Sequence, residues 1–294
     1  MICVRLEGGI GNQLYQYAAG RALALRHRTG LLLDTTTLQR RIRGVTHRRF
    51  ELQHFQHSAH LCAPTASSLF PWFHRAAAVS HWISPWRTFV EKGVSYENDF
   101  SGLPDQTYLV GYWQSFRYFS SVADQVVADL VPVSPLSAAS NAIAQRMDSS
   151  VSVALHVRRG DYVSLVAAAE LHGTLSPAHY EKAMARVSET VGHARYFVFS
   201  DDAEWCRANL RLENDAVFVT HNTGADAWQD LLLMARCQHH IIANSSFSWW
   251  GAWLADQRRH AAASHLVVAP ARWFAGRPEQ NLHDRYPAHW VIQP

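Results

Sequence analysis

Long apolar stretches are missing from this chain of 294 residues. The best candidate, residues 231–243, contains Arg236 and several further polar residues, so it falls short of the roughly 20 apolar residues that cross a bilayer. A basic and apolar leader is also missing before the strand expected at Ile2, and no secretory signal is visible. From these absences we expect a cytoplasmic protein, with the inner face of the membrane as an alternative location.

The chain also has few cysteines, a small net charge and no metal-binding signature. The four cysteines show no C-x-x-C spacing, which is typical of reduced core residues and argues against a disulfide framework. A formal charge of +3 is too small to predict a nucleic-acid partner. Because no D-x-D stands at a predicted strand end and no H-x-x-x-H occurs, we expect neither a metal nor another cofactor.

Aromatic residues, by contrast, are plentiful. Trp occurs 11 times, and aromatic rings suit sugar faces as well as protein cores. Two stretches rich in Arg and Trp, residues 40–49 and 71–87, leave peripheral membrane contact open as an alternative to a solvated or packed face. With 48% hydrophobic and 17% charged residues, the composition is globular, and the length favours two domains.

The second half of the chain alternates short apolar runs with helical patterns. The apolar runs are residues 151–157, 196–199, 216–219, 240–243 and 266–269. Among the helices between them, the one after the first run has a typical start, Ser176 followed by Pro177. This alternation predicts an α/β fold with a parallel, doubly wound sheet. A Pro-containing break at residues 131–135 places the domain boundary there, giving domains 1–135 and 136–294.

The chain opens with a predicted β-α-β unit, made of residues 2–6, 12–27 and 31–34. Its first turn, Gly8-Gly9-Ile10-Gly11, is similar to a dinucleotide-binding loop, with Asp34 in place for a ribose. The third glycine of that fingerprint is replaced by Leu14, so nicotinamide chemistry is a weak alternative. Residues 35–103 lack a clear period and predict irregular structure and short helices.

Polar residues follow directly on four predicted strands of the second half. These groups are residues 158–161, 200–202, 221–223 and 244–246. Because the carboxyl ends of parallel strands share one edge, where ligands bind, we expect the four loops to converge. Arg158 and Arg159 offer planar forks of donors that suit a diphosphate, and Gly160 lets the backbone approach closely. The alternative is a solvated strand end paired with Asp161.

Other polar residues at strand ends also have two interpretations. Asp201 or Asp202 offers a carboxylate to the adjacent donors of guanine, and Ser245 and Ser246 stand before a helix predicted at residues 248–255, where phosphate is favoured. Asp202 and Ser246 are alternatively helix caps. Trp113 and Gln114 follow a predicted strand and suit a sugar acceptor, or else are core residues beneath a turn.

Four stretches together resemble the α-1,2-fucosyltransferase family. They are residues 8–14 (GGIGNQL), 156–162 (HVRRGDY), 199–202 (FSDD) and 244–254 (NSSFSWWGAWL). The resemblance covers nearly the whole chain. It implies two Rossmann-like domains facing across a cleft, the GT-B architecture, with the acceptor on the first and GDP-fucose on the second. It further implies a galactoside 2-α-L-fucosyltransferase: metal-independent, inverting transfer of L-fucose from GDP-fucose to a galactose-terminated oligosaccharide or lipid-linked glycan, in O-antigen or other surface glycan synthesis.

The resemblance also implies roles for individual residues. Arg158 is expected to grip the β-phosphate and Asn12 to lie near the reacting sugar, and both join Asp161 in the expected catalytic set. The expected donor-binding set is His156, Arg158, Arg159, Asp202, Asn244, Ser245, Ser246 and Phe247. The expected acceptor-binding set is Trp113 and Gln114.

Two questions stay open at this point. The general base is Asp161, or Glu7 or Glu170 behind it, or no residue at all if the leaving diphosphate takes the proton. The alternative to an enzyme is a non-catalytic glycan-binding protein of the same fold that stacks sugars on Trp113, Trp249 and Trp250. Paired arginines at a strand end argue against that alternative, because a lectin has no use for them.

Overall fold

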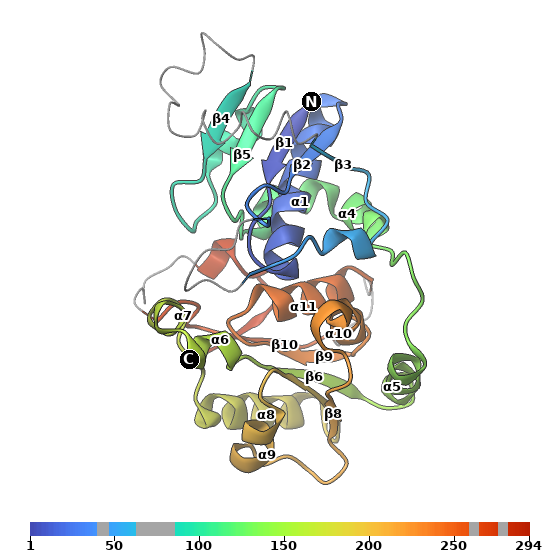
Figure 1. Cartoon of the computed structure of the whole chain (residues 1–294). Helices are drawn as coiled ribbons and strands as arrows, with labels where there is room; N and C mark the ends of the chain where they lie inside the picture. The colour runs from blue at the N-terminus through green and yellow to red at the C-terminus, as the bar shows by residue number, and fades with distance from the viewer. Residues whose placement is uncertain (40–46, 63–85, 259–264, 276–281) are drawn as a thin grey trace. The chain divides into compact units, whose positions relative to one another are not determined.

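The computed structural model describes residues 1–39, 47–62, 86–258, 265–275 and 282–294 (Figure 1). Most of residues 40–49 and 71–87, where membrane contact was an alternative, lies outside these ranges. In the part of the chain that is described, no helix is both long and apolar enough to cross a membrane.

The chain forms two compact units. Unit 1 is Met1–Val133 with His283–Arg285, and unit 2 is Ser134–Leu282 with Tyr286–Pro294. The boundary expected after residue 135 lies close to this division, but the sequence did not reveal that a short segment near the C-terminus belongs to unit 1. Each unit contains a parallel sheet, which confirms the predicted α/β class.

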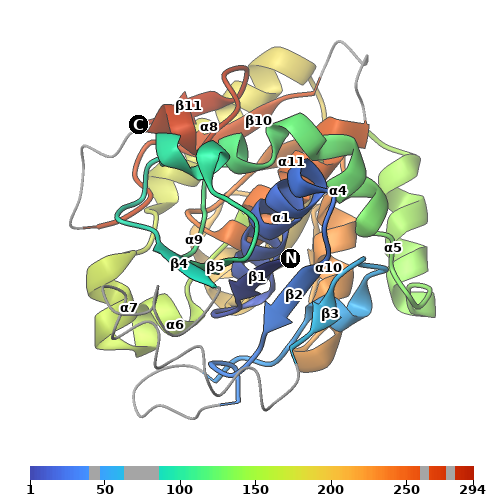
Figure 2. The same cartoon turned by 90° about the horizontal axis from the view of Figure 1, so that it is seen from above.

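Unit 1 is built on a five-stranded parallel sheet in the order β3-β2-β1-β5-β4. Its strands are β1 (Ile2–Arg5), β2 (Leu31–Asp34), β3 (His60–Leu61), β4 (Arg87–Val90) and β5 (Thr107–Val110). Figure 2 shows β2 and β3 on one side of β1 and β5 with β4 on the other. The chain order therefore reverses between β1 and β5, a topological switch point where open α/β sheets bind ligands.

Helices connect and flank these strands. They are α1 (Ile10–His27), α4 (Ala123–Asp129) and the 3₁₀ turns η1 (Leu52–His54), η3 (Asn98–Gly102), η4 (Phe116–Tyr118) and η5 (Ser120–Val122). Helix α1 packs so closely that a Cβ on Gly20 would lie 2.8 Å from Leu31 Cδ1. The structure adds β3 and β4 to a region in which the sequence predicted no strands.

Asp34 belongs to the core of unit 1. Its carboxylate is fully buried and accepts hydrogen bonds from the Tyr108 hydroxyl (2.7 Å) and from both the N–H (2.9 Å) and the hydroxyl (2.7 Å) of Thr36. A carboxylate with these partners is not available to a ribose, so the nicotinamide alternative loses its acidic residue.

Unit 2 is built on a six-stranded parallel sheet in the order β11-β10-β9-β6-β7-β8. Its strands are β6 (Ser152–Val157), β7 (Arg195–Ser200), β8 (Val217–Val219), β9 (His239–Ile241), β10 (Val267–Pro270) and β11 (Val291–Gln293). Its α-helices are α5 (Ala138–Asp148), α6 (Gly160–Ser164), α7 (Val166–Leu171), α8 (Pro177–Val191), α9 (Ala203–Asn209), α10 (Trp228–Met234) and α11 (Ser246–Arg258). All five strands expected in this half are confirmed, and β11 was missed.

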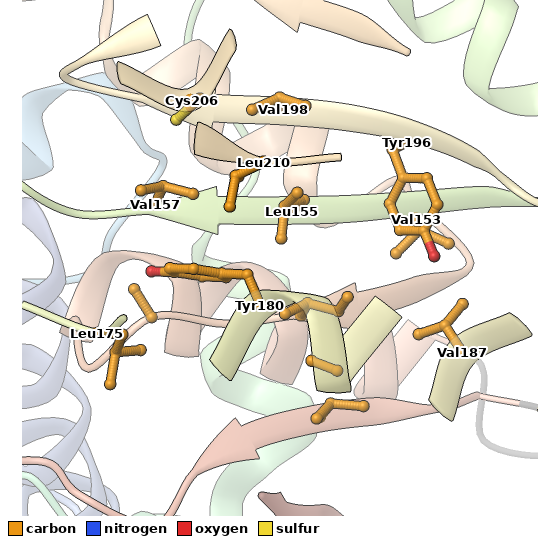
Figure 3. Close-up of a cluster of buried hydrophobic side chains, with 14 of the residues drawn as sticks. Val153, Leu155, Val157, Leu175, Tyr180, Val187, Tyr196, Val198, Cys206 and Leu210 are labelled. Atoms are coloured by element: carbon orange, nitrogen blue, oxygen red, sulfur yellow. The ribbon is translucent and has the colours of Figure 1, made fainter. Parts of the chain in front are cut away.

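Helices cover both faces of this sheet (Figure 1). Val153, Leu155 and Val157 of β6 face α8, and Figure 3 shows Tyr180 and Val187 pointing at them from that helix. The alternate residues of β6 face the opposite side, where α5 and α10 pack. Because both faces are covered, every residue of β6 is buried, as its continuous apolar run predicted. The predicted start of α8 is confirmed, since the Ser176 hydroxyl accepts a hydrogen bond from the His179 N–H.

Candidate functional site

The sheet of unit 2 reverses its winding between β6 and β9. The chain runs from β6 through β7 to β8 on one side, and β9 to β11 follow on the other. Ligands in open α/β sheets bind at the carboxyl ends of strands at such a point. The loops after β6 and β9 meet there: the Tyr162 hydroxyl donates to the Asn244 carbonyl oxygen (3.2 Å), and the rings of His156 and Phe247 lie 5.8 Å apart. Residues about 80 positions apart in the sequence are thereby brought together, as the strand-end argument predicted for these two of the four loops. In the loop after β8, Asn222 instead hydrogen-bonds Ser140 and Asp230.

Arg158 lies at the centre of this group. Its Nη2 donates to Asp161 Oδ1 (2.5 Å), its Nη1 pairs with Asp201 Oδ2 (2.8 Å), and its guanidinium lies 5.5 Å from the centre of the Tyr162 ring. Burial opposes the charge, but Asp201 and Asp161 outweigh it and raise the pKa of Arg158. The side chain is 25% exposed, so it is neither a solvated strand end nor closed to a ligand.

Arg159 is held by a separate set of contacts. Its Nε donates to Asp202 Oδ2 (3.1 Å), its guanidinium lies 4.1 Å from the centre of the Trp205 ring, and its backbone N–H donates to Asp201 Oδ1 (2.8 Å). Asp201 therefore binds both arginine residues. A Cβ on Gly160 would lie 2.5 Å from Asp201 Oδ2, so this approach requires glycine. We call Arg158, Arg159, Asp161, Asp201 and Asp202 the arginine cluster.

The roles of Asp201 and Asp202 in the structure differ from those that the sequence predicted. Asp202 is the N-cap of α9, with Oδ1 accepting from the Trp205 N–H (3.1 Å), so the capping interpretation describes the structure. Recognition of guanine by Asp202 stays a prediction. Asp201, the other candidate for guanine, was left out of the expected donor set, although it follows β7 directly.

Two buried polar atoms beside the arginine cluster have no hydrogen-bond partner among the described residues. They are His156 Nδ1 and Asn244 Oδ1, on side chains in residues that are 5% and 1% exposed. Burial, assisted by the charge of Arg158, lowers the pKa of His156 to about 3, so its ring is neutral at pH 7. The Asn244 Nδ2 donates to the carbonyls of His172 (3.1 Å) and Trp273 (3.2 Å), which leaves its oxygen for another donor. Unpaired buried polar atoms are rare in proteins and are expected where a ligand binds.

The start of α11 adds hydrogen-bond donors to the same place. The helix begins at Ser246, two residues earlier than the sequence predicted, so Phe247 lies in its first turn. The Ser245 hydroxyl oxygen accepts from the Phe247 N–H (3.3 Å). Backbone N–H groups in a first helical turn favour an anion.

A second polar group lies in unit 1, between the carboxyl ends of β1 and β5. Gln114 Nε2 donates to Asn12 Oδ1 (2.9 Å), and Arg285 Nη1 donates to Gln114 Oε1 (2.9 Å). The sequence predicted Asn12 and Gln114 separately and missed Arg285. No local pattern marks Arg285, since it is 171 positions from Gln114 and belongs to the segment that returns to unit 1.

The prediction that Trp113 stacks on the acceptor was wrong. Trp113 is fully buried and packs against Phe100 and Tyr118, with ring centres 5.4 and 5.3 Å away, so neither face is available to a sugar. Trp249 and Trp250 are also fully buried. The glycan-binding alternative therefore loses all three of its stacking platforms.

The three candidate bases lie in different environments. Asp161 is bound to Arg158, the Arg5 guanidinium donates to Glu7 (3.3 Å), and Glu170 is exposed on α7. None of the three is thereby identified as the base. Within the described ranges, no group of three or more His, Cys, Asp or Glu is arranged to hold a metal ion, and metal independence stays a prediction.

The chain is similar to several known glycosyltransferases. It is 31% identical to an α-1,2-colitosyltransferase of Escherichia coli, with 99% of this chain and 98% of the relative covered. It is 29% identical to the O-antigen biosynthesis glycosyltransferase WbnK of Escherichia coli, with 94% and 96% covered. It is 26% identical to galactoside α-(1,2)-fucosyltransferase 1 of Ateles belzebuth, with 85% of this chain and 64% of the relative covered.

Solved structures show the same fold at low sequence identity. The structure of NodZ α-1,6-fucosyltransferase soaked with GDP-fucose is 18% identical, covers 86% of this chain and 92% of its own, and has a TM-score of 0.53. NodZ from Bradyrhizobium is 15% identical, with 85% and 92% covered and a TM-score of 0.52. The predicted GT-B class is confirmed. Residues 90–292 match the profile of glycosyl transferase family 11, and the chain belongs to that family.

Proposed function

We propose that this chain is an inverting galactoside 2-α-L-fucosyltransferase. It moves L-fucose from GDP-β-L-fucose to the 2-hydroxyl of a terminal galactoside, on an oligosaccharide or a lipid-linked glycan of O-antigen or another surface glycan. Family membership supports glycosyl transfer, and the names of two relatives support an α-1,2 linkage. The name of a third supports O-antigen synthesis.

The arginine cluster is the observation that carries this proposal. Departure of GDP builds negative charge on the β-phosphate, and a cation already in place when that charge appears lowers the barrier. Arg158 has five N–H donors. Its two ion pairs, with Asp161 and Asp201, use one nitrogen each, so donors remain for a phosphate. His156 Nδ1, Asn244 Oδ1 and the first turn of α11 supply further polar groups for the nucleotide.

In this mechanism Asp161 positions Arg158. Its Oδ1 is 2.5 Å from Arg158 Nη2, so the carboxylate holds the guanidinium in a fixed orientation. The attacking 2-hydroxyl then gives its proton either to another carboxylate or to the departing diphosphate. Unit 2 is the donor-binding domain in this proposal, and unit 1, through Asn12 and Gln114, contacts the acceptor.

The test is a transfer assay with a defined panel of acceptors. The protein is incubated with GDP-fucose and β1,3- or β1,4-linked galactosides, and the product linkage is read by NMR. An α-1,2-linked fucose on galactose is the expected product. A rise in melting temperature with galactosides but none with GDP would instead indicate a glycan-binding protein, because ligands stabilise the state that they bind.

The relative named as a colitosyltransferase favours a second candidate, transfer of colitose. Colitose is fucose without its 3-hydroxyl, so the two donors differ by one polar group. A site that hydrogen-bonds this hydroxyl would reject GDP-colitose by about 10⁴-fold in kcat/KM, whereas a site that does not would discriminate far less. Competition between the two sugar nucleotides in one reaction decides between them.

A further inference from the structure

The segment that returns to unit 1 near the C-terminus is held there by Asp284. Its carboxylate accepts hydrogen bonds from the Arg117 guanidinium (2.6 Å) and the Tyr96 N–H (3.1 Å). Its carbonyl oxygen accepts one from the Ser115 hydroxyl (2.5 Å). Asp284 and Arg285 are 6% and 3% exposed. Hydrogen bonds to the carboxylate and to the backbone carbonyl of Asp284 therefore hold this segment, and they fix the position of the neighbouring Arg285.

Arg285 determines the polarity of the two amides next to it. A guanidinium has only donors, so the Gln114 atom that lies 2.9 Å from Arg285 Nη1 must be the amide oxygen. The nitrogen of Gln114 then points the other way, where it lies 2.9 Å from Asn12. That atom of Asn12 must be its oxygen, because the Gln114 nitrogen is a donor. One cation therefore fixes two side-chain amides that would otherwise be able to turn over.

The consequence appears at Asn12. With its oxygen bound to Gln114, Asn12 presents Nδ2, and no acceptor for this atom occurs among the residues that the structure describes. Glycine is required beside this amide, because Gly8 has a φ of 79° and a Cβ there would lie 2.4 Å from Asn12 Nδ2. Asn12 is thus a hydrogen-bond donor at the carboxyl end of β1, half-buried in the first turn of α1.

We propose that Arg285 is a positioning residue for the sugar acceptor. It holds Gln114, and through Gln114 it holds Asn12, so that Asn12 donates a hydrogen bond to an oxygen of the bound galactoside. In this arrangement the Asn12 oxygen takes no proton from the attacking hydroxyl. The identity of the ligand rests on the proposed function, but the polarity of the amides does not.

The sharpest test is Gln114→Glu. A glutamate has almost the same shape and still accepts from Arg285, but it cannot donate to Asn12. The Asn12 amide then turns so that its nitrogen faces the new carboxylate and its oxygen faces the sugar. We expect kcat/KM for the galactoside to fall about 10- to 100-fold, as for the loss of one buried hydrogen bond. The Kd of GDP and the melting temperature should stay at the parental values.

A purely structural role predicts a different result. The new ion pair with Arg285 would then be neutral or stabilising, and kcat/KM would stay within about twofold of the parent, which would overturn the proposal. Gln145→Glu is the matched control, because it makes the same charge change at an exposed position of α5 in unit 2. Arg285→Lys keeps a donor and should lose less kcat/KM than Arg285→Met.

An NMR measurement that needs no enzymatic activity tests the role of Arg285 independently of the proposed function. Absence of transfer by the parent to any galactoside would refute the function and leave the amide polarity to be tested by NMR. In the parent one side-chain amide proton of Gln114 is bonded to Asn12 and should exchange slowly with water. Arg285→Met frees Gln114 to turn, so exchange should quicken about tenfold. Unchanged exchange in a folded Arg285→Met variant would refute the role of Arg285.

Discussion

Replacing Arg158 with lysine tests the centre of the proposed mechanism. The guanidinium binds Asp161 and Asp201 through two different nitrogens, at 2.5 and 2.8 Å, and these contacts fix its plane. Lysine keeps the positive charge but has one nitrogen and no plane, so it cannot hold both carboxylates and a phosphate in the same geometry. We therefore expect Arg158→Lys to bind GDP-fucose and to transfer fucose slowly.

The magnitude follows from what is lost. Removing one preorganised donor from an oxyanion-type site lowers kcat by about 10²–10³. For stability, a charge-assisted hydrogen bond contributes about 1.5–3 kcal/mol, which we reduce to about 1–2 kcal/mol because these side chains are 18–26% exposed. That loss lowers the melting temperature by roughly 2–8 °C. Arg158→Ala should lose more stability, since Asp161 and Asp201 then face each other without a cation, and should be nearly inactive yet folded.

The assay combines steady-state kinetics at saturating GDP-fucose with calorimetric titration of GDP. Arg146→Lys is the control, since it makes the same exchange at an exposed position of α5 and should leave kcat unchanged. Near-parental turnover in Arg158→Lys would refute the reasoning. It would show that a positive charge at position 158 is enough for catalysis and that other residues bind the diphosphate. Arg159 would then be the next residue to test.

Four further predictions concern the metal, two carboxylates and a histidine. Incubation with EDTA should leave most of the transfer activity, and a loss that Mn²⁺ or Mg²⁺ restores would contradict metal independence. Asp202→Asn can still cap α9, but its amide N–H group would face the N–H donors of guanine, so binding of GDP should weaken by about 1–3 kcal/mol. An unchanged Kd would mean that Asp202 is only a helix cap. In Asp161→Asn, a loss of both turnover and GDP affinity indicates that Asp161 orients Arg158, whereas a loss of turnover alone indicates a base. Burial lowers the pKa of His156 to about 3, so between about pH 6.5 and 3 the unfolded state binds a proton that the folded state does not, and the free energy of unfolding falls as the pH falls through this range. In urea unfolding, the decrease in the free energy of unfolding from pH 7 to pH 5 should be about 2 kcal/mol smaller in His156→Gln than in the parent.

Local patterns in the sequence were sufficient for the central strands and for the position of the donor-side polar residues. The apolar run before His156 predicted β6, because a strand covered by helices on both faces has no polar positions. Arg158 to Asp161 were then predicted at the ligand-binding edge, since a parallel sheet places all of its carboxyl ends together. Short edge strands such as β3 and β11 carry no such pattern and were missed.

The sequence by itself determined the α/β class, the order of the main elements and which polar residues follow a strand, because each of these depends on neighbours a few positions away. Only the tertiary structure decided which residues meet. Trp113 was assigned to a sugar and is core, since the exposure of a side chain depends on what packs over it. Asp201 is the carboxylate shared by both arginines, which depends on the pairing of β6 with β7. Arg285 fixes the polarity of Gln114 from 171 positions away, a contact that exists only because the chain returns to unit 1 and that no local period can encode.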